Sequence, residues 1–139
     1  MSTDSSSSIV PLLGRFLISI IFILSGVNKV ASFSMMTGFV ASKGMPLPYL
    51  MIGGAAAVEI LGGLAILAGF QTKIAAWILF LFLIPTTAMF HNFWVMQGAD
   101  RMDNQGHFMK NLAIMGGLLF VAAFGAGSYS VDSRTAARA

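Results

Sequence analysis

The amino-acid sequence predicts an all-α protein, a four-helix transmembrane bundle with a short interfacial helix between the first and second spans. Charged residues are scarce, since eight Lys or Arg and five Asp or Glu make up only 9% of the 139 residues, against about 25% in a typical soluble domain. Apolar residues make up 57% of the chain, which is more than a soluble domain of this length can bury. Four apolar segments are long enough, or nearly so, to cross a bilayer. We therefore expect lipid to cover the outer surface of the protein.

The four predicted spans are residues 9–27, 50–70, 74–90 and 112–127. Crossing the hydrocarbon takes about 20 residues at about 1.5 Å of rise each, so the two shorter spans are expected to continue into residues 91–94 and 128–129. Only residues 71–73 connect the second and third spans. These two spans must therefore form an antiparallel hairpin.

The remaining segments are predicted from their polarity and spacing. Phe33, Met36, Phe39 and Val40 have helical spacing ahead of a proline-containing turn, which predicts a short helix lying in the membrane interface. Polar residues 100–106 are predicted to form a loop between the third and fourth spans. The expected organisation is a mobile polar tail at residues 1–8, a membrane domain at 9–129 and a polar C-terminal tail at 130–139.

Several classes of function are excluded by residue types that the sequence lacks. With no cysteine, the chain has no disulfide, catalytic thiolate or iron–sulfur ligand set. The net charge of +3 comes from dispersed cations and not from a basic patch, so we expect no nucleic-acid partner. His91 and His107 are not placed for haem ligation, and no metal-binding signature is present, so we expect no metal site. Nucleotide-binding and hydrolase motifs are also absent.

Glu59 is the most informative residue, because a charge in the hydrocarbon costs about 2.5–3.5 kcal/mol. Its helical face carries mostly small residues, which is typical of a face packed inside a membrane bundle. Arg15 and Lys29 share a face of the first span, so we expect an Arg15–Glu59 ion pair to join the first two spans, with Arg15 and Lys29 together balancing the carboxylate. Three roles stay open for Glu59: a structural ion pair, a proton relay or ligand site, and a neutral carboxyl facing lipid.

A second polar group gathers at the span ends away from the termini. His91 ends the third span, and Lys110 and Asn111 open the fourth. Polar residues are common at such ends, but His91 could also donate a hydrogen bond to a quinone carbonyl or carry a proton. No catalytic residue can be assigned. The candidates for ligand binding or proton relay are Glu59, His91, Arg15, Lys29, Lys110 and Asn111.

Short motifs extend along most of the chain. They are Gly14-Arg15, Ser25-Gly26-Val27-Asn28-Lys29, Gly44-Met45-Pro46-Leu47-Pro48, the segment 59–69 with its repeated small residues, His91-Asn92-Phe93-Trp94 and Lys110-Asn111-Leu112-Ala113. In this order and spacing they resemble the DoxX family of small bacterial integral membrane proteins. The resemblance implies a four-helix protein of the bacterial inner (plasma) membrane with both termini in the cytoplasm, an orientation that the even distribution of Lys and Arg does not specify. The polar positions of the family pattern fall on the six candidates named above.

The resemblance also implies a function. Similar proteins include a subunit of archaeal thiosulfate:quinone oxidoreductase and a mycobacterial protein linked to a membrane oxidoreductase complex. We therefore expect a subunit of, or an accessory to, a membrane oxidoreductase assembly, with quinone as the cofactor it contacts and a soluble oxidoreductase subunit as partner. The alternative is a small homo-oligomeric transporter, or a membrane anchoring or assembly protein without redox chemistry. The sequence does not decide whether the chain is an enzyme.

Overall fold

The computed structural model describes residues 5–138 as a helical protein. Its elements are α1 (Ser5–Ala31), α2 (Phe33–Ser42), α3 (Pro48–Ala68), α4 (Thr72–Phe90), the short 3-10 helix η1 (Phe93–Val95), α5 (Gly98–Phe124) and α6 (Val131–Ala136). Within this part of the chain there is no strand, and four helices, α1, α3, α4 and α5, are long and apolar enough to cross a membrane. The predicted all-α fold, with four spans and a shorter apolar helix between the first two, is confirmed.

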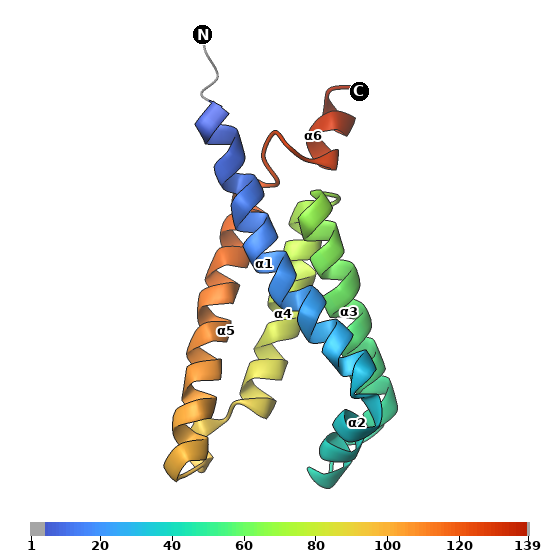
Figure 1. Cartoon of the computed structure of the whole chain (residues 1–139), viewed down its shortest axis with the longest axis vertical. Coiled ribbons are helices and arrows are strands. Elements are labelled where there is room, and N and C mark those ends of the chain that lie inside the picture. The colour runs from blue at the N-terminus through green and yellow to red at the C-terminus, as the bar shows by residue number, and fades with distance from the viewer. Residues whose placement is uncertain (1–4, 139) are drawn as a thin grey trace.

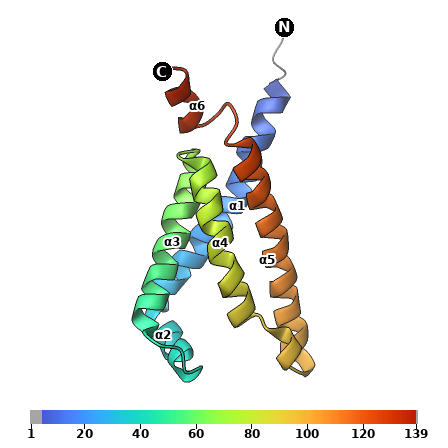
Figure 2. The same cartoon turned by 180° about the vertical axis from the view of Figure 1, so that it is seen from behind.

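The four long helices are arranged as two pairs. Helix α1 packs along α3, α4 packs along α5, and the turn between α3 and α4 joins the pairs. The two pairs lie close together at the end that carries α6 and diverge toward the end that carries α2 and η1, as both views show (Figures 1 and 2). Helix α2 lies beside α3 at the end where the two pairs diverge.

Two glycines allow α1 to approach α3 closely. A Cβ at Gly26 would lie 3.0 Å from the Ala56 carbonyl oxygen and 3.2 Å from Glu59 Cβ. A Cβ at Gly63 would lie 3.2 Å from the Ser19 carbonyl oxygen. Small residues at these crossing points permit backbone contact between membrane helices. They also set the register, which places the end of α1 beside the middle of α3.

The apolar core lies where α3, α4 and α5 meet. Ile66, Leu79 and Leu118 are fully buried there. Outward-facing side chains are apolar as well, and Phe120 and Phe124 of α5 are 70% and 80% exposed. Apart from the polar first turns of α5, the outer surface of the four long helices is mostly apolar, as expected of a protein solvated by lipid.

Several helix ends differ from the predicted ones. The third span does not continue as an α-helix into residues 91–94, because α4 ends at Phe90, and the fourth does not reach residues 128–129, because α5 ends at Phe124 before Gly125. Helix α1 begins at Ser5 and so includes residues 5–8 of the predicted polar tail, whereas residues 1–4 lie outside the described part of the chain. The predicted loop at 100–106 is wrong, because these residues form the first turns of α5. Gly98 begins this helix with a positive φ of 59°, and Asp100 stands in the first turn, where the helix dipole favours a carboxylate. A helix continues through polar residues when it leaves the membrane, so apolar content alone underestimates its length.

The C-terminal segment is folded back onto the turn between α3 and α4. The Asp132 carboxylate accepts hydrogen bonds from the Gln71 backbone N–H (2.8 Å), the Thr72 backbone N–H (2.9 Å) and the Thr72 hydroxyl (2.6 Å). The Asp132 N–H donates to the Gly69 carbonyl at 2.8 Å. Burial acts to raise the pKa of Asp132, but the hydrogen bonds from Thr72 and Gln71 and the charge of Arg15 hold it below its usual value. Asp132 therefore caps the N-terminus of α4 as an anion.

Candidate functional site

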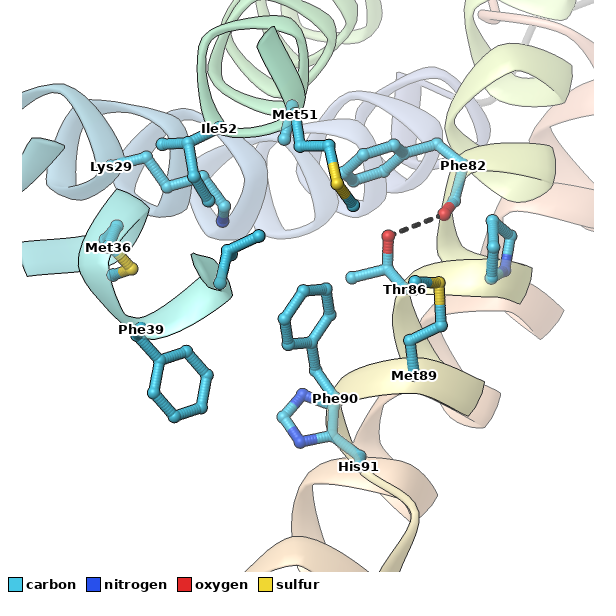
Figure 3. A pocket seen from close by; sticks show the side chains of 13 residues that line it. Lys29, Met36, Phe39, Met51, Ile52, Phe82, Thr86, Met89, Phe90 and His91 are labelled. Carbon is cyan, nitrogen blue, oxygen red and sulfur yellow. Dashed lines mark hydrogen bonds between the residues drawn. The ribbon is translucent and has the colours of Figure 1, made fainter. Parts of the chain in front are cut away.

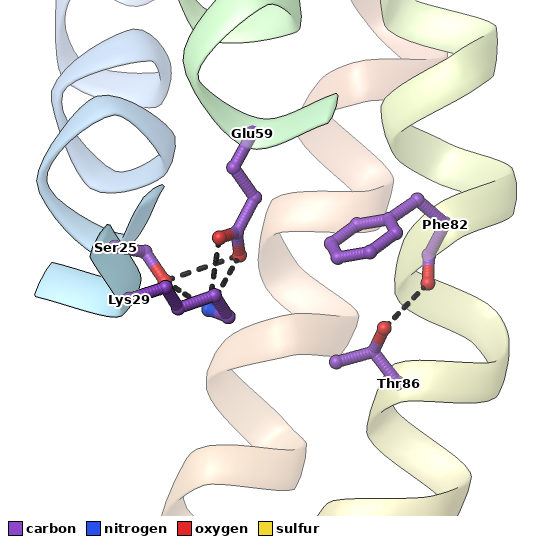
Figure 4. A network of polar contacts seen from close by, with 5 residues as sticks. All are labelled: Ser25, Lys29, Glu59, Phe82 and Thr86. Carbon is purple, nitrogen blue, oxygen red and sulfur yellow. Dashed lines mark hydrogen bonds and ion pairs between the residues drawn. The ribbon is translucent and has the colours of Figure 1, made fainter. Parts of the chain in front are cut away.

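A buried ion pair joins α1 to the middle of α3. Lys29 Nζ lies 2.8 Å from Glu59 Oε2 and donates a hydrogen bond to Oε1 at 3.1 Å. The Ser25 hydroxyl donates to Glu59 Oε1 at 3.1 Å and accepts a hydrogen bond from Lys29 Nζ at 2.9 Å. The side chains of Lys29 and Glu59 are only 17% and 5% exposed. Figure 4 shows this network on the side of α1 and α3 that faces Phe82 and Thr86 of α4.

The local sequence explains how the network forms. Ser25 and Lys29 are four residues apart in α1, so both side chains lie on the same helical face. Gly26, in the same turn, allows that face to approach the backbone of α3 at Glu59. The resulting pair has no net charge, which lowers the cost of holding it within the membrane. Of the two cations expected to balance Glu59 together, Lys29 is the one that contacts its carboxylate.

The predicted Arg15–Glu59 ion pair is wrong. Arg15 is 2% exposed, and its guanidinium donates to the carbonyls of Ile66 (3.4 Å) and Leu67 (3.3 Å) and to that of Tyr129. The register of α1 against α3 places Arg15 beside the C-terminal end of α3, away from its midpoint. The C-terminal end of a helix carries the negative end of the helix dipole, which favours a cation beside its last carbonyls. Arg15 therefore ties the helix ends and the C-terminal segment together.

A partly open cavity of about 400 Å³ lies between α4 on one side and α1, α2 and α3 on the other (Figure 3). Its apolar lining consists of Met36, Phe39, Val40, Met51, Ile52, Ala55, Phe82, Pro85, Met89 and Phe90. Its polar lining consists of Lys29, Thr86 and His91. Small-molecule sites in proteins usually occupy about 300–1,000 Å³ and combine apolar walls with a few polar groups. The cavity fits this description.

The α4 wall of the cavity contains a proline. Pro85 has no backbone N–H, so it interrupts the hydrogen-bond ladder of α4 beside the cavity. The Thr86 hydroxyl donates to the Phe82 carbonyl at 2.8 Å, one turn back.

His91 is held at the open end of the cavity by residues of α5. Its Nδ1 lies 3.1 Å from Asn104 Oδ1, and its ring stacks on that of His107 with centroids 5.0 Å apart. Lys110 is exposed, with Nζ 3.3 Å from His107 Nδ1, and lies outside the cavity lining. Asn111 is 7% exposed and donates to the Thr87 hydroxyl at 3.0 Å.

The six predicted candidates therefore occupy three separate places. Lys29 and His91 line the cavity, and Glu59 lies directly behind Lys29. Arg15 lies at the opposite end of the bundle, while Asn111 of α5 bonds Thr87 of α4 and Lys110, its neighbour in the sequence, is exposed on α5 beside His107. Between residues 5 and 138 no group of three or more His, Asp or Glu is placed to hold a metal ion.

Sequence reasoning missed two features of the site. Ser25, which completes the ion-pair network, stands four residues before Lys29, and this spacing was the available signal. The role of α2 in bordering the cavity could not be read from the sequence, because it depends on how the two helix pairs diverge.

Comparison with known proteins places this arrangement in a family. The family model DoxX matches residues 10–92. The chain belongs to the DoxX family. The matched region includes every helix that borders the cavity, from α1 to the end of α4, so the ion pair and His91 both lie within the family domain.

Two DoxX-family relatives extend over most of the chain. The inner membrane protein YphA of Escherichia coli is 32% identical over 123 residues, 88% of each chain. The inner membrane protein YqjF of Escherichia coli is 35% identical over 124 residues, 87% of this chain and 88% of the relative. The ER-derived vesicles protein ERV29 of Saccharomyces cerevisiae is 36% identical over 77 residues, 55% of this chain and 25% of that protein. No solved structure matches. The two inner membrane relatives, together with the four apolar spans, identify an integral membrane protein, consistent with a multi-pass protein of the inner membrane.

Proposed function

We propose that this DoxX-family protein is a subunit of, or an accessory to, a membrane oxidoreductase assembly, and that it holds a quinone head group in the cavity between α4 and α1–α3. The observation that carries the proposal is the cavity, which combines a volume of about 400 Å³ with apolar walls and a few polar groups, Lys29, Thr86 and His91. Both termini are expected to lie in the cytoplasm.

The chemistry of a quinone matches these walls. A quinone is a flat apolar ring with carbonyl acceptors on opposite edges and an apolar tail. The Lys29 ammonium, on the side of α1 and α3, can share one of its hydrogens with a quinone carbonyl, while Thr86 and His91 supply polar groups on the opposite side of the cavity. Aromatic and Met side chains pack well against a flat ring. A partly open cavity within the spans lets such a molecule enter from the lipid.

The electron donor belongs to a partner in this proposal. With no cysteine and two histidines, the chain has few residues that could bind a redox group of its own. A soluble oxidoreductase subunit would supply electrons, and the DoxX-family protein would bind and orient the quinone. Cross-linking in native membranes tests this part of the proposal: capture of a soluble oxidoreductase supports it, whereas cross-links to further copies of this chain alone contradict it.

Quinone binding can be tested with a photoreactive quinone added to the purified protein in nanodiscs. We expect labelling to map to cavity residues such as Met51 and Met89 and to fall when unlabelled quinone is in excess. Ala55→Trp fills the cavity and should abolish this labelling. Ala57→Trp is the matched control, because Ala57 is exposed on the same helix outside the cavity. Labelling spread over the outer helix faces, unaffected by Ala55→Trp or by competitor, would contradict the proposal.

A further inference from the structure

The Lys29–Glu59 pair presents only its positive end to the cavity. Lys29 lines the cavity, whereas Glu59 is absent from its lining and has a side chain only 5% exposed. An ammonium group has three N–H donors. Three oxygens surround Lys29 Nζ: Ser25 Oγ at 2.9 Å, Glu59 Oε1 at 3.1 Å and Glu59 Oε2 at 2.8 Å.

This arrangement treats neutral and anionic ligands differently. A carbonyl oxygen can share a hydrogen of the ammonium, because the dipole of the pair points its positive end at the cavity. A carboxylate at the same place would face the Glu59 carboxylate just behind Lys29, and the site would then hold an uncompensated negative charge within the membrane. Like charges in such a setting repel strongly, and an unpaired charge in an apolar medium is costly.

Other charges near the cavity do not change this balance. The other ionisable side chain in the cavity lining is His91, which lies across the cavity on α4 and is held by Asn104. Lys110 lies outside the lining and contacts His107. The charge felt by a ligand at Lys29 is therefore set mainly by Glu59.

We infer that Glu59 determines the ligand class of this cavity. By neutralising Lys29 it selects neutral apolar molecules that carry a hydrogen-bond acceptor, and it excludes fatty acids and other lipids with a carboxylate head. Specificity of this kind is a difference between two affinities, produced here by repulsion of the wrong ligand. The inference rests on the cavity being a ligand site, as in the proposed function, and does not depend on redox chemistry.

Two photoreactive probes that differ only in head-group charge can test the inference. A diazirine-bearing dodecanoic acid and its methyl ester have the same chain, and the acid is used above its own pKa in the micelle. In the wild-type protein the ester should label cavity residues in preference to the acid. In Glu59→Gln the ratio of acid to ester labelling should rise at least about tenfold, which corresponds to about 1.4 kcal/mol. An unchanged ratio would overturn the inference.

Two further variants separate charge from packing. Glu59→Asp keeps the negative charge and should retain the wild-type preference for the ester. Lys29→Met combined with Glu59→Gln removes both charges without leaving either one unpaired, so it should fold and should not gain labelling by the acid. A gain in the double variant would show that cavity size, and not charge, controls the preference, and would contradict the inference.

Failure of the inference and failure of the proposed function give different results. If the cavity accepts the ester but not a photoreactive quinone, quinone binding is wrong while selection against anions stands. If quinone labels the cavity but Glu59→Gln leaves the acid-to-ester ratio unchanged, the site is supported and the role of Glu59 is refuted.

Discussion

Removing Lys29 should destabilise the protein more than removing the whole ion pair. In Lys29→Met, the Glu59 carboxylate stays buried, with a side chain 5% exposed, and loses its contacts to Nζ at 2.8 and 3.1 Å. The hydrogen bond from the Ser25 hydroxyl at 3.1 Å remains. Breaking one side of a buried ion pair costs about 3–5 kcal/mol. Because Ser25 still binds the carboxylate, we expect a loss of unfolding free energy near the lower limit, about 3 kcal/mol.

The opposite single substitution should cost less. Glu59→Leu leaves Lys29 unpaired. The Lys29 side chain is long and 17% exposed, so it can move its ammonium toward water. We therefore expect a loss of unfolding free energy of about 2 kcal/mol, below the range for a fully buried unpaired charge. The double variant Lys29→Met with Glu59→Leu removes both charges and should lie within about 2 kcal/mol of the wild type. The two sites should therefore show a coupling energy of at least about 3 kcal/mol.

A double-mutant cycle measures this coupling, with unfolding followed by circular dichroism in mixed micelles of fixed composition. The same cycle for Arg15→Leu and Glu59→Leu is the control, because Arg15 binds backbone carbonyls at the far end of α3. Those two substitutions should be additive within about 0.5 kcal/mol. Additivity at Lys29 and Glu59, or strong coupling between Arg15 and Glu59, would refute the helix register on which the site depends.

Three further predictions concern other parts of the molecule. Asp132→Asn should lower the free energy of unfolding by about 1–2 kcal/mol because the cap of α4 is weakened. The pKa of Asp132 is lowered in the folded state. Its stabilising contribution is therefore present above the ordinary carboxyl pKa and is lost as the pH falls through the lowered pKa. Thermal melts of variant and wild type should therefore converge in acid, and a constant difference would contradict the cap. Gly26→Ala should lower the free energy of unfolding by about 1–3 kcal/mol in the same melts, because the added methyl group has no room against α3. Gly14→Ala is the control: an added Cβ there would have nothing within 4 Å, so stability should be unchanged or higher by up to about 1 kcal/mol. Equal effects of the two substitutions would argue against close packing at Gly26. The ring centroids of Phe39 on α2 and Phe90 on α4 are 6.4 Å apart at the cavity. In F39C/F90C, a short cleavable thiol-specific cross-linker between the two positions should reduce labelling of the cavity, and cleavage of the cross-linker should restore it. Undiminished labelling would show that ligands enter elsewhere.

The fold could be predicted because membrane spans are specified by a single strong property of the sequence. Long apolar runs located all four spans, and the turn at residues 71–73 required a hairpin. The polar character of residues 100–106 predicts a loop, but these residues form the first turns of α5, where backbone hydrogen bonds and the charge of Asp100 stabilise a helix. The apolar content of a segment predicts which residues lie in the lipid, but it does not predict where the helix begins or ends.

The candidate site could be predicted only in part. The cost of a buried charge singled out Glu59, and the shared helical face singled out Arg15 and Lys29. The choice between the two cations depended on the register of α1 against α3, which is set by close packing at Gly26 and Gly63. The sequence shows which residues share a face of one helix, but it does not show how far that helix is shifted along its neighbour.

The contacts of Arg15 have a consequence for how the chain enters the membrane. Its three acceptors lie 51, 52 and 114 residues further along the sequence, so none of them exists when α1 leaves the ribosome. The first span must carry an unsatisfied guanidinium through the early stages of insertion, and its last partner arrives only when residue 129 has been made. The hydrogen bonds of the first helix are therefore completed only when the C-terminal segment has been made. A chain that ends before Tyr129 would lack one of the acceptors of Arg15.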